Sequence, residues 1–552
     1  MPLPVQSLRA PLLCLLAPFM AGIALADHSP VPNAWLPAPI LCGAGLGFIA
    51  WWLAERNSER SRWLWPLAVI GAGTMVGFVA LLVRSPRLEG PEAAPREVVV
   101  ILEAQQVFPP SPQRKTFSGL GRIIAADAHL AELTGQRVYF SAIKKISVLP
   151  ARAGRYQVRG VLQPLAPGTG SEAIAGFQSY LASAGIRLTL TRAQFTREVR
   201  PPGWFRRFCT RAEDQLESIL RQGIERHPGE TSLYLGMLLG ERAALSAEQQ
   251  NAFMRSGTFH IFSISGLHVG VIATAILAVL QLLRLSSRVA HVSGLLLLWL
   301  YVQITGASVP AERAFLMIAF IFGSKLFRLP SNSLAALAAS ALLTLWLDPQ
   351  QLFSAGFQMS YAVVTALIVM SAPLAERWQA AWKPWRDLPE VNWGWPRHWA
   401  VWIGREIIGA WAATWVALLA STPSSIGYFG LFSPGALLAN LIVIPLSTFA
   451  IIGGFVSLVG GLCGLGGISL VFNHAAVVLI KTMDWLVLHG TNLPGVYLPA
   501  QFAAPWVAPL TLVFLLAVML AGASVRWPRH WGATWWPALA VTLILFFGVK
   551  FG

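Results

Sequence analysis

The sequence predicts a polytopic α-helical membrane protein with an inserted small β-barrel (OB-like) soluble domain. Hydrophobic residues make up 55% of the chain and charged residues only 12%, and the mean hydropathy is +0.58, which is typical of membrane proteins with many spans. Apolar segments long enough to cross a bilayer recur along the chain. One polar region with short alternating strand patterns interrupts them, and this region predicts the soluble domain.

Residues 1–83 are expected to form N-terminal transmembrane anchor helices. The apolar segments are Leu8–Ala26, Trp35–Ala54 and Trp63–Val83. We expect the first to be retained as an anchor, although Ala24-Leu25-Ala26 resembles a signal cleavage site. The loop before the third segment carries Arg56, Arg60 and Arg62, whereas the preceding loop has no Lys or Arg. The positive-inside rule therefore places the N-terminus inside and the region after Val83 outside.

Residues 84–202 are expected to form an outward-facing OB-like domain. The predicted strands are Glu97–Val107, Thr116–Ala125, Gln136–Ile143, Arg155–Leu165 and Ile186–Val199, with a short helix near Ser171–Ser183. Five short strands and one helix are typical of a small closed barrel of the OB type.

The outward region is basic, since its Lys and Arg residues outnumber its Asp and Glu residues. The positive-inside rule does not account for an excess on that side, so it favours an anionic partner. An OB barrel binds single strands by combining basic groups with aromatic rings. The predicted DNA-binding residues are Arg137, Tyr139, Lys144, Lys145, Arg155 and Arg159, beside the further aromatic residues Phe117, Phe140 and Tyr156. Alternation along the strands instead predicts that about half of these rings lie in the barrel core.

Residues 203–256 are expected to form amphipathic helices. From Trp204 to His227, apolar residues recur at helical spacing with arginines opposite them. This pattern predicts a helix that lies on a membrane surface or beside a pore mouth, and a partner helix is the alternative.

Residues 257–552 are expected to form a transmembrane channel domain of ten apolar segments. These lie near 259–283, 290–308, 312–327, 331–347, 353–373, 401–420, 433–461, 465–488, 505–523 and 535–551. If they alternate across the membrane, basic residues such as Arg284, Lys325, Lys383 and Arg526 fall in the inside loops, and the C-terminus is outside.

The first of these segments is unusually polar at its start, where it carries His260, Ser263, Ser265 and His268. On one continuous helix, His260 and His268 would lie about 80° apart and share a face. Polar groups at membrane depth are costly unless they face protein or water, so this start is expected to line a wet path. The alternative is that small and polar residues allow close helix packing.

Further polar positions interrupt later segments. Arg313 follows Ser308-Val309-Pro310-Ala311-Glu312 and is the expected phosphate contact, unless this charged pair simply marks the membrane interface. Gln358 and Tyr361 give one helix a polar side, useful in a pore or between helices. Asn440 precedes Pro445, which breaks a span and frees a backbone carbonyl.

These strings resemble ComEC-type competence proteins, the inner-membrane channels that draw single-stranded DNA into transforming bacteria. The similar strings are GFQSYLASAGI, HIFSISGLHVGVI, SVPAERAFLM, FSAGFQMSY and NLIVIP. The resemblance implies a multi-pass protein of the bacterial inner membrane that translocates single-stranded DNA, with an outward domain at the position of the barrel. Its DNA path would then include His260, Ser263, Ser265, His268, Arg313, Gln358, Tyr361 and Asn440, and Arg313→Ala is expected to lower uptake more than Arg526→Ala.

Many proteins of this kind also carry a metallo-β-lactamase-like domain, whose zinc-ligand pattern His-x-His-x-Asp-His is not found in this sequence. There is also no Gly-Lys-Thr/Ser phosphate loop. We therefore expect no catalytic site, metal or cofactor. The expected partners are single-stranded DNA, membrane lipids, a DNA receptor outside, a cytoplasmic motor ATPase and a nuclease supplied in trans.

Two functions from other classes stay open on the sequence. A small-solute secondary transporter would show two inverted halves with broken helices, and no internal repeat is visible. An intramembrane hydrolase would use Ser265 as nucleophile with His268 or His260 as base. Residues three apart on one helix rarely align for attack, and no second motif supplies an oxyanion hole.

Overall fold

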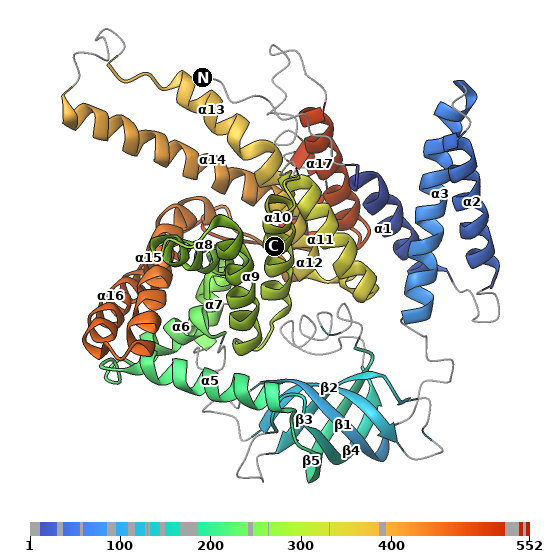
Figure 1. Ribbon diagram of the computed structural model, residues 1–552, viewed down its shortest axis with the longest axis horizontal. Coiled ribbons are helices and arrows are strands. Elements are labelled where there is room, and N and C mark those ends of the chain that lie inside the picture. The colour runs from blue at the N-terminus through green and yellow to red at the C-terminus, as the bar shows by residue number, and fades with distance from the viewer. Residues whose placement is uncertain are drawn as a thin grey trace. The chain divides into compact units, whose positions relative to one another are not determined.

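The computed structural model describes most of the chain. The described residues are 11–29, 37–55, 59–84, 95–108, 116–126, 130, 133–143, 150–165, 181, 186–240, 247–262, 264–329, 332–385, 394–524, and 540–541, 543–544 and 548–551. The fold is a polytopic helical protein with a small closed β-barrel (Figure 1). The predicted helix near Ser171–Ser183 and the residues Lys144, Lys145, Ser263 and Arg526 lie outside the described residues.

The chain divides into two compact units, which are described separately. One contains Arg9–Ala212 and Ala335–Phe357, and the other contains Met1–Leu8, Glu213–Leu334 and Gln358–Gly552. We call the first the barrel unit and the second the bundle unit.

The barrel unit begins with three apolar helices. These are α1 (Leu13–His28), α2 (Pro37–Glu55) and α3 (Glu59–Arg84). Glycines allow α1 and α3 to approach closely: a Cβ on Gly22 would lie 1.9 Å from the Thr74 carbonyl oxygen, and one on Gly77 would lie 2.1 Å from that of Phe19. Small residues at such crossings are the usual means of helix association in membranes.

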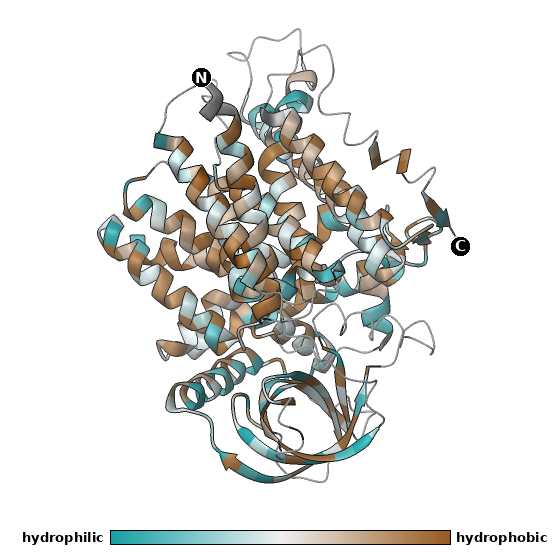
Figure 2. Ribbon diagram, turned by 90° about the vertical axis from the view of Figure 1, so that its right-hand side faces the viewer, coloured by the Kyte–Doolittle hydropathy of each residue, from teal (hydrophilic) through white to brown (hydrophobic). Residues whose placement is uncertain are grey.

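The five predicted strands all form. They are β1 (Arg96–Phe108), β2 (Thr116–Ala126), β3 (Arg137–Ile143), β4 (Arg155–Pro164) and β5 (Leu188–Arg200). They close into a barrel in the order β1-β2-β3-β5-β4, with β3 and β5 parallel and the other pairs antiparallel. The strands alternate in hydropathy while the long helices are mostly apolar (Figure 2).

The barrel core explains which aromatic residues face inward. Phe117 and Phe140 are 3% and 0% exposed and pack against Phe195. Tyr156 also contacts Phe195, and its hydroxyl accepts a hydrogen bond from the Ala151 amide. The alternative that about half of the predicted rings are core residues is therefore confirmed for Phe117 and Phe140.

The remaining elements follow the barrel in chain order. They are α5 (Trp204–Arg221), α6 (Pro228–Leu238), α7 (Ala247–Arg255), η3 (Phe259–Phe262), α8 (Gly266–Leu282), α9 (Ser287–Ile304), α10 (Val309–Leu326), α11 (Ser333–Leu347), η4 (Pro349–Phe353), α12 (Ala355–Ala366), η5 (Leu367–Ser371), α13 (Ala372–Ala381), α14 (Trp395–Phe429), β6 (Leu431–Phe432), α15 (Ala436–Leu462), α16 (Gly466–Gly490), β7 (Leu498–Phe502), α17 (Val507–Ser524) and β8 (Val549–Phe551). Within the described residues, seven helices are long and apolar enough to cross a membrane.

Three sequence predictions need correction. The helix expected over 259–283 starts only at Gly266, because Ser265 caps it. The amphipathic helix from Trp204 ends at Arg221, since Gly223 takes a left-handed φ of +80°. The apolar segment 535–551 ends in the strand β8, where Lys550 pairs with Gln501 of β7. A short apolar run alone does not distinguish a strand from a helix.

A buried asparagine holds four elements of the bundle unit together. Asn473 on α16 accepts hydrogen bonds from the hydroxyls of Ser457 on α15 (2.7 Å) and Tyr234 on α6 (3.3 Å). Its amide nitrogen donates to the carbonyls of Ile219 (2.9 Å) and Gln222 (3.1 Å), at the end of α5. Asn473 and Ser457 are 0% exposed. Every polar group of this side chain is thus matched, as a buried amide requires.

We predict that Asn473→Leu destabilises the protein by about 2–4 kcal/mol, because it leaves the buried hydroxyls of Ser457 and Tyr234 without their acceptor and removes a donor from two part-buried carbonyls. The measurement is the thermal unfolding midpoint of the purified protein in detergent. Asn492→Leu is the matched control, since Asn492 is exposed. Equal midpoints for the two variants would contradict the role assigned to Asn473.

Candidate functional site

The polar segment 257–268 is a break between two helices rather than the start of one. Gly257 has a φ of +71°, and a Cβ added there would lie 2.9 Å from the Cβ of Ala436. The short helix η3 follows and carries His260, which is exposed and whose Nδ1 lies 3.2 Å from the Gly257 carbonyl oxygen. Helix α8 starts anew at Gly266. His260 and His268 therefore do not share a helix face, contrary to the expectation from a continuous helix.

Ser265 and His268 form a reciprocal cap at the start of α8. The Ser265 side chain accepts a hydrogen bond from the backbone amide of His268, and the imidazole accepts one from the backbone amide of Ser265, with an N–N distance of 3.3 Å. The Ser265 Oγ also lies 2.7 Å from His268 Nδ1. Such a box satisfies amides that a helix start otherwise leaves without partners.

This cap fixes the tautomer of His268. Because Nδ1 accepts from the Ser265 amide, Nδ1 carries no proton, and the proton of the neutral ring lies on Nε2. His268 is 0% exposed; its Nε2 has no well-formed hydrogen bond among the described residues, and the ring has the Ile261 backbone as a further hydrogen-bonding neighbour. A buried donor gains from a well-placed acceptor. The ring thus holds a buried N–H whose described hydrogen bonding is weak.

The start of α10 lies next to the start of α8. A Cβ on Gly266 would lie 3.9 Å from the Cβ of Ala314. Ser308 precedes the helix, and its buried Oγ has no partner within the described part of the chain. One turn further, Arg313 is 3% exposed and donates from Nη2 to the Ser360 hydroxyl on α12 at 3.1 Å. The structure therefore places Arg313 inside the bundle rather than at its surface.

A third helix start completes the arrangement. Helix α15 begins at Ala436, against the Gly257 turn. Asn440 lies in its first turns, and its buried Oδ1 has no partner among described residues. The starts of α8, α10 and α15 thus carry polar side chains inside an apolar bundle. Helix starts concentrate partial positive charge and exposed amides and so favour an anion, whereas the Asn440 oxygen requires a hydrogen-bond donor.

The remaining residues of the predicted path lie on α12. Gln358 is half-buried and shares a hydrogen bond with Tyr428 of α14. Tyr361 is 8% exposed, and its carbonyl accepts from Thr365. Both residues take part in helix packing, which the sequence left open as the alternative to pore lining. Ser360, between these two residues, contacts Arg313. The sequence reading did not select it, although it lies within the string FQMSY that carried the family resemblance.

On the barrel, three of the predicted DNA-binding arginines form ion pairs. Arg155 pairs with Glu103 at 2.9 Å, Arg159 with Glu97 at 2.6 Å and Arg137 with Asp348 at 2.9 Å. The hydrogen bond and the charge of Arg159 lower the pKa of Glu97, so this pair persists into mildly acidic solution. Tyr139 is half-buried on β3.

Strand β5 carries further exposed cations that the sequence reading did not select. Arg192, Arg197 and Arg200 are exposed along this strand, and Arg200 is the register partner of Arg155 on β4. Exposed pairs such as those of Arg137 and Arg159 contribute little stability, so a phosphate can replace their carboxylates. The three arginines within nine residues of the last strand were the signal for this basic edge.

No group of three His, Cys, Asp or Glu side chains suited to a metal is present in the part of the chain that the structure describes. The four cysteines are free, and Cys209 is buried while the others are exposed. The polar cluster itself offers hydroxyls, amides, an imidazole and a guanidinium.

These features define a multi-pass membrane protein with a small barrel and a buried polar cluster at three helix starts. The family model described as Competence protein matches residues 237–526, more than half of the 552 residues. The chain belongs to the competence protein family. The matched region contains α8, α10 and α15, and hence every residue of the polar cluster.

Individual relatives match over a shorter stretch. The ComE operon protein 3 of Bacillus subtilis (strain 168) is 28% identical over 230 residues, which cover 42% of this chain and 26% of that protein. Recombination protein 2 of Haemophilus influenzae is 25% identical over 230 residues, 40% of this chain and 27% of that protein. The uncharacterized protein YcaI of Escherichia coli (strain K12) is 28% identical over 228 residues. The match thus spans about a quarter of the first two relatives. No solved structure matches the chain significantly.

We predict that Ser265→Ala lowers the stability by about 1 kcal/mol while Ser265→Asn stays close to the original, because Asn also caps helix starts. Thermal midpoints in detergent measure this difference. Ser286 precedes α9 without a capping hydrogen bond, so Ser286→Ala is the control and should change little. A larger loss for Ser286→Ala than for Ser265→Ala would contradict the capping role.

Proposed function

We propose that this chain forms an inner-membrane channel that carries single-stranded DNA into the cytoplasm during natural transformation. The observation that carries the proposal is the set of three helix starts inside an apolar bundle whose buried polar atoms on His268, Ser308 and Asn440 have no well-formed hydrogen bond among the described residues. The family membership supports it, because it covers these same helices.

The chemistry of the cluster suits a passing phosphodiester. The Nε2–H of His268 and the Ser308 hydroxyl donate hydrogen bonds, Arg313 adds a permanent charge, and the helix starts add partial positive charge. Conduction requires contacts that are favourable but weak enough to release the strand. Several neutral donors with one arginine meet this requirement better than a dense group of cations would.

The barrel is proposed to lie on the outer side of the membrane and to bind the incoming single-stranded DNA. Its exposed arginines on β5, together with Arg137, Arg155 and Arg159, supply the basic groups that hold a phosphate backbone. A DNA receptor outside, a motor ATPase in the cytoplasm and a nuclease are the proposed partners, and energy for transport would come from them.

The Ser265–His268 contact of 2.7 Å also favours a second candidate, an intramembrane hydrolase. The two side chains are in contact because Ser265 lies just before the helix start and His268 in its first turn, so both take part in the cap. In the cap, however, the hydroxyl and the ring also bind backbone amides. Ser265→Asn separates the two functions, because it keeps a cap and removes the nucleophile.

The direct test replaces the channel of a transformable host with this chain and measures imported DNA that is protected from added nuclease. We expect the chain to restore uptake and Ser265→Leu with His268→Leu to abolish it. Ser265→Asn should retain uptake in a channel and lose activity in a hydrolase. Absence of uptake with normal membrane levels of the unchanged chain would contradict the channel, and a small-solute transporter would then be the next function to test.

We predict that Arg313→Gln lowers uptake about tenfold or more, because it removes a buried charge-assisted contact. Arg288→Gln is the matched control, since Arg288 is exposed near the start of α9, and it should change uptake little. Membrane levels of both variants are measured by immunoblot. Equal, small effects would remove Arg313 from the DNA path.

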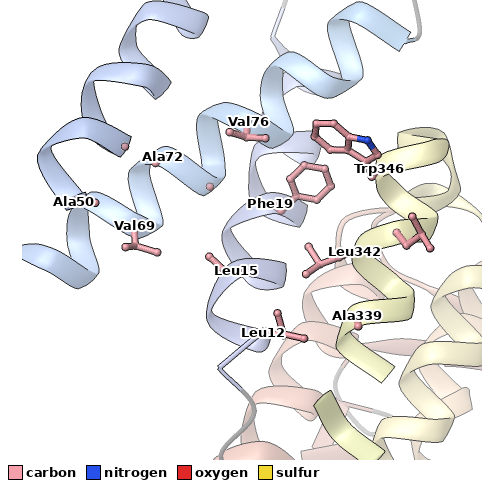
Figure 3. A pocket seen from close by; sticks show the side chains of 13 residues that line it. Leu12, Leu15, Phe19, Ala50, Val69, Ala72, Val76, Ala339, Leu342 and Trp346 are labelled. Atoms are coloured by element: carbon pink, nitrogen blue, oxygen red, sulfur yellow. The ribbon is translucent and has the colours of Figure 1, made fainter. Parts of the chain in front are cut away.

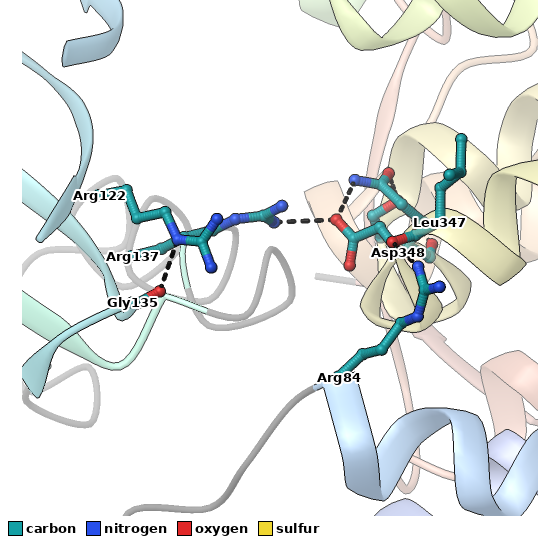
Figure 4. Close-up of polar contacts among 8 residues, drawn as sticks. Arg84, Arg122, Gly135, Arg137, Leu347 and Asp348 are labelled. Carbon is teal, nitrogen blue, oxygen red and sulfur yellow. Dashed lines mark hydrogen bonds and ion pairs between the residues drawn. The ribbon is translucent and has the colours of Figure 1, made fainter. Parts of the chain in front are cut away.

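We predict that Asp348→Asn strengthens binding of a single-stranded oligonucleotide to the purified protein a few-fold, because it releases Arg137 from its ion pair (Figure 4). Arg137→Gln should weaken binding and reduce its salt dependence. Glu217→Gln is the control, since it makes the same charge change and releases Arg221 on α5. Fluorescence anisotropy at fixed salt measures the affinities. An equal gain in the Glu217 variant would show a net-charge effect only.

A further inference from the structure

An apolar groove lies within the barrel unit between the first three helices and α11. Figure 3 shows side chains from these helices pointing into it. Its volume is about 640 Å³, and it is open on one side. The lining includes Leu15 and Phe19 of α1, Gly47 of α2, Val76 of α3, and Leu342 and Trp346 of α11.

The groove is incompletely covered by protein. Leu15, Val76 and Trp346 are 44%, 43% and 49% exposed although they line it. Two of the four helices, α2 and α3, are long and apolar enough to span a membrane. Only 11% of the apolar stretch of α2 is buried within the protein. In a membrane, the neighbour of such a surface is the hydrocarbon of a lipid.

One end of the groove carries a fixed positive charge. The guanidinium of Arg84, at the end of α3, lies 5.5 Å from the centroid of the Trp346 ring, which also lines the groove. Its Nη1 donates to the Leu347 carbonyl at 3.0 Å, which holds the side chain in place (Figure 4). A guanidinium has five N–H donors, so others are left for a phosphate after this bond.

We propose that the groove binds one anionic phospholipid, with an acyl chain along the apolar lining and the headgroup phosphate on Arg84. The volume lies within the range of ligand pockets. Tryptophan beside arginine at the end of a span is also the arrangement that membrane interfaces favour. The charge of Arg84 selects an anionic headgroup over a zwitterionic one.

The glycines of α2 provide a matched pair of variants. A Cβ added at Gly47 or at Gly45 has no atom within 4 Å, so a larger side chain fits at both positions. Gly47 lines the groove and Gly45 does not. Gly47→Leu therefore fills the groove, and Gly45→Leu adds the same side chain outside it.

The experiment uses the full chain in nanodiscs with equal phosphatidylglycerol and phosphatidylcholine of the same acyl chains. Lipids retained after detergent release are counted by native mass spectrometry. We expect retained phosphatidylglycerol to exceed phosphatidylcholine a few-fold, because both phosphates can bind Arg84 but the choline cation of phosphatidylcholine is repelled by it. Gly47→Leu should lose the retained lipid, and Gly45→Leu should keep it. Arg84→Gln should keep a lipid but lose the headgroup preference, whereas Arg187→Gln on the barrel should keep both.

Equal retention in the Gly47 and Gly45 variants would overturn the proposal, as would equal retention of the two headgroups by the unchanged chain. A change of Gly47→Leu from dimer to monomer without loss of lipid would show that a second copy fills the groove, which also overturns it. Thermal midpoints of the variants show whether each remains folded. If Gly47→Leu loses lipid because it unfolds, the smaller Gly47→Val takes its place in the comparison.

Discussion

A polar group inside an apolar helix bundle must find a polar partner, and this constraint organises the bundle unit. Asn473 meets it completely, because its oxygen accepts two hydroxyl protons and its nitrogen donates to two carbonyls. The carbonyls lie at the end of α5, where Gly223 stops the helix and leaves them available. One side chain thus fixes α16 against three other elements.

The cluster at the starts of α8, α10 and α15 departs from the same constraint. His268, Ser308 and Asn440 each hold a buried atom without a well-formed hydrogen bond among the described residues, as does Ser424 on α14. A fold that only needed stability would place apolar side chains here, since unmatched buried groups cost free energy. Asn473, whose polar atoms are all matched, contrasts with His268 and Ser308, which can still donate to a ligand, and with Asn440, whose oxygen can still accept a hydrogen bond.

The sequence was sufficient for the fold class, because composition and alternation report on burial. It predicted all five strands of the barrel and most of the apolar helices. It did not predict the break before Gly266, because the side chains of Ser265 and His268 form the cap only after the chain turns back. Ion pairs such as Arg137 with Asp348 join residues far apart in the chain, so spacing gave no signal for them.

Within the barrel unit, Arg84 and Arg137 meet the same end of α11. Arg84 donates to the Leu347 carbonyl, and Arg137 pairs with Asp348, the next residue. The end of a helix carries partial negative charge, which attracts both cations. A phosphate on Arg137 would displace Asp348, whereas Arg84 keeps its bond to the Leu347 carbonyl and binds a phosphate with its remaining donors. The two ligands therefore use separate groups at this helix end.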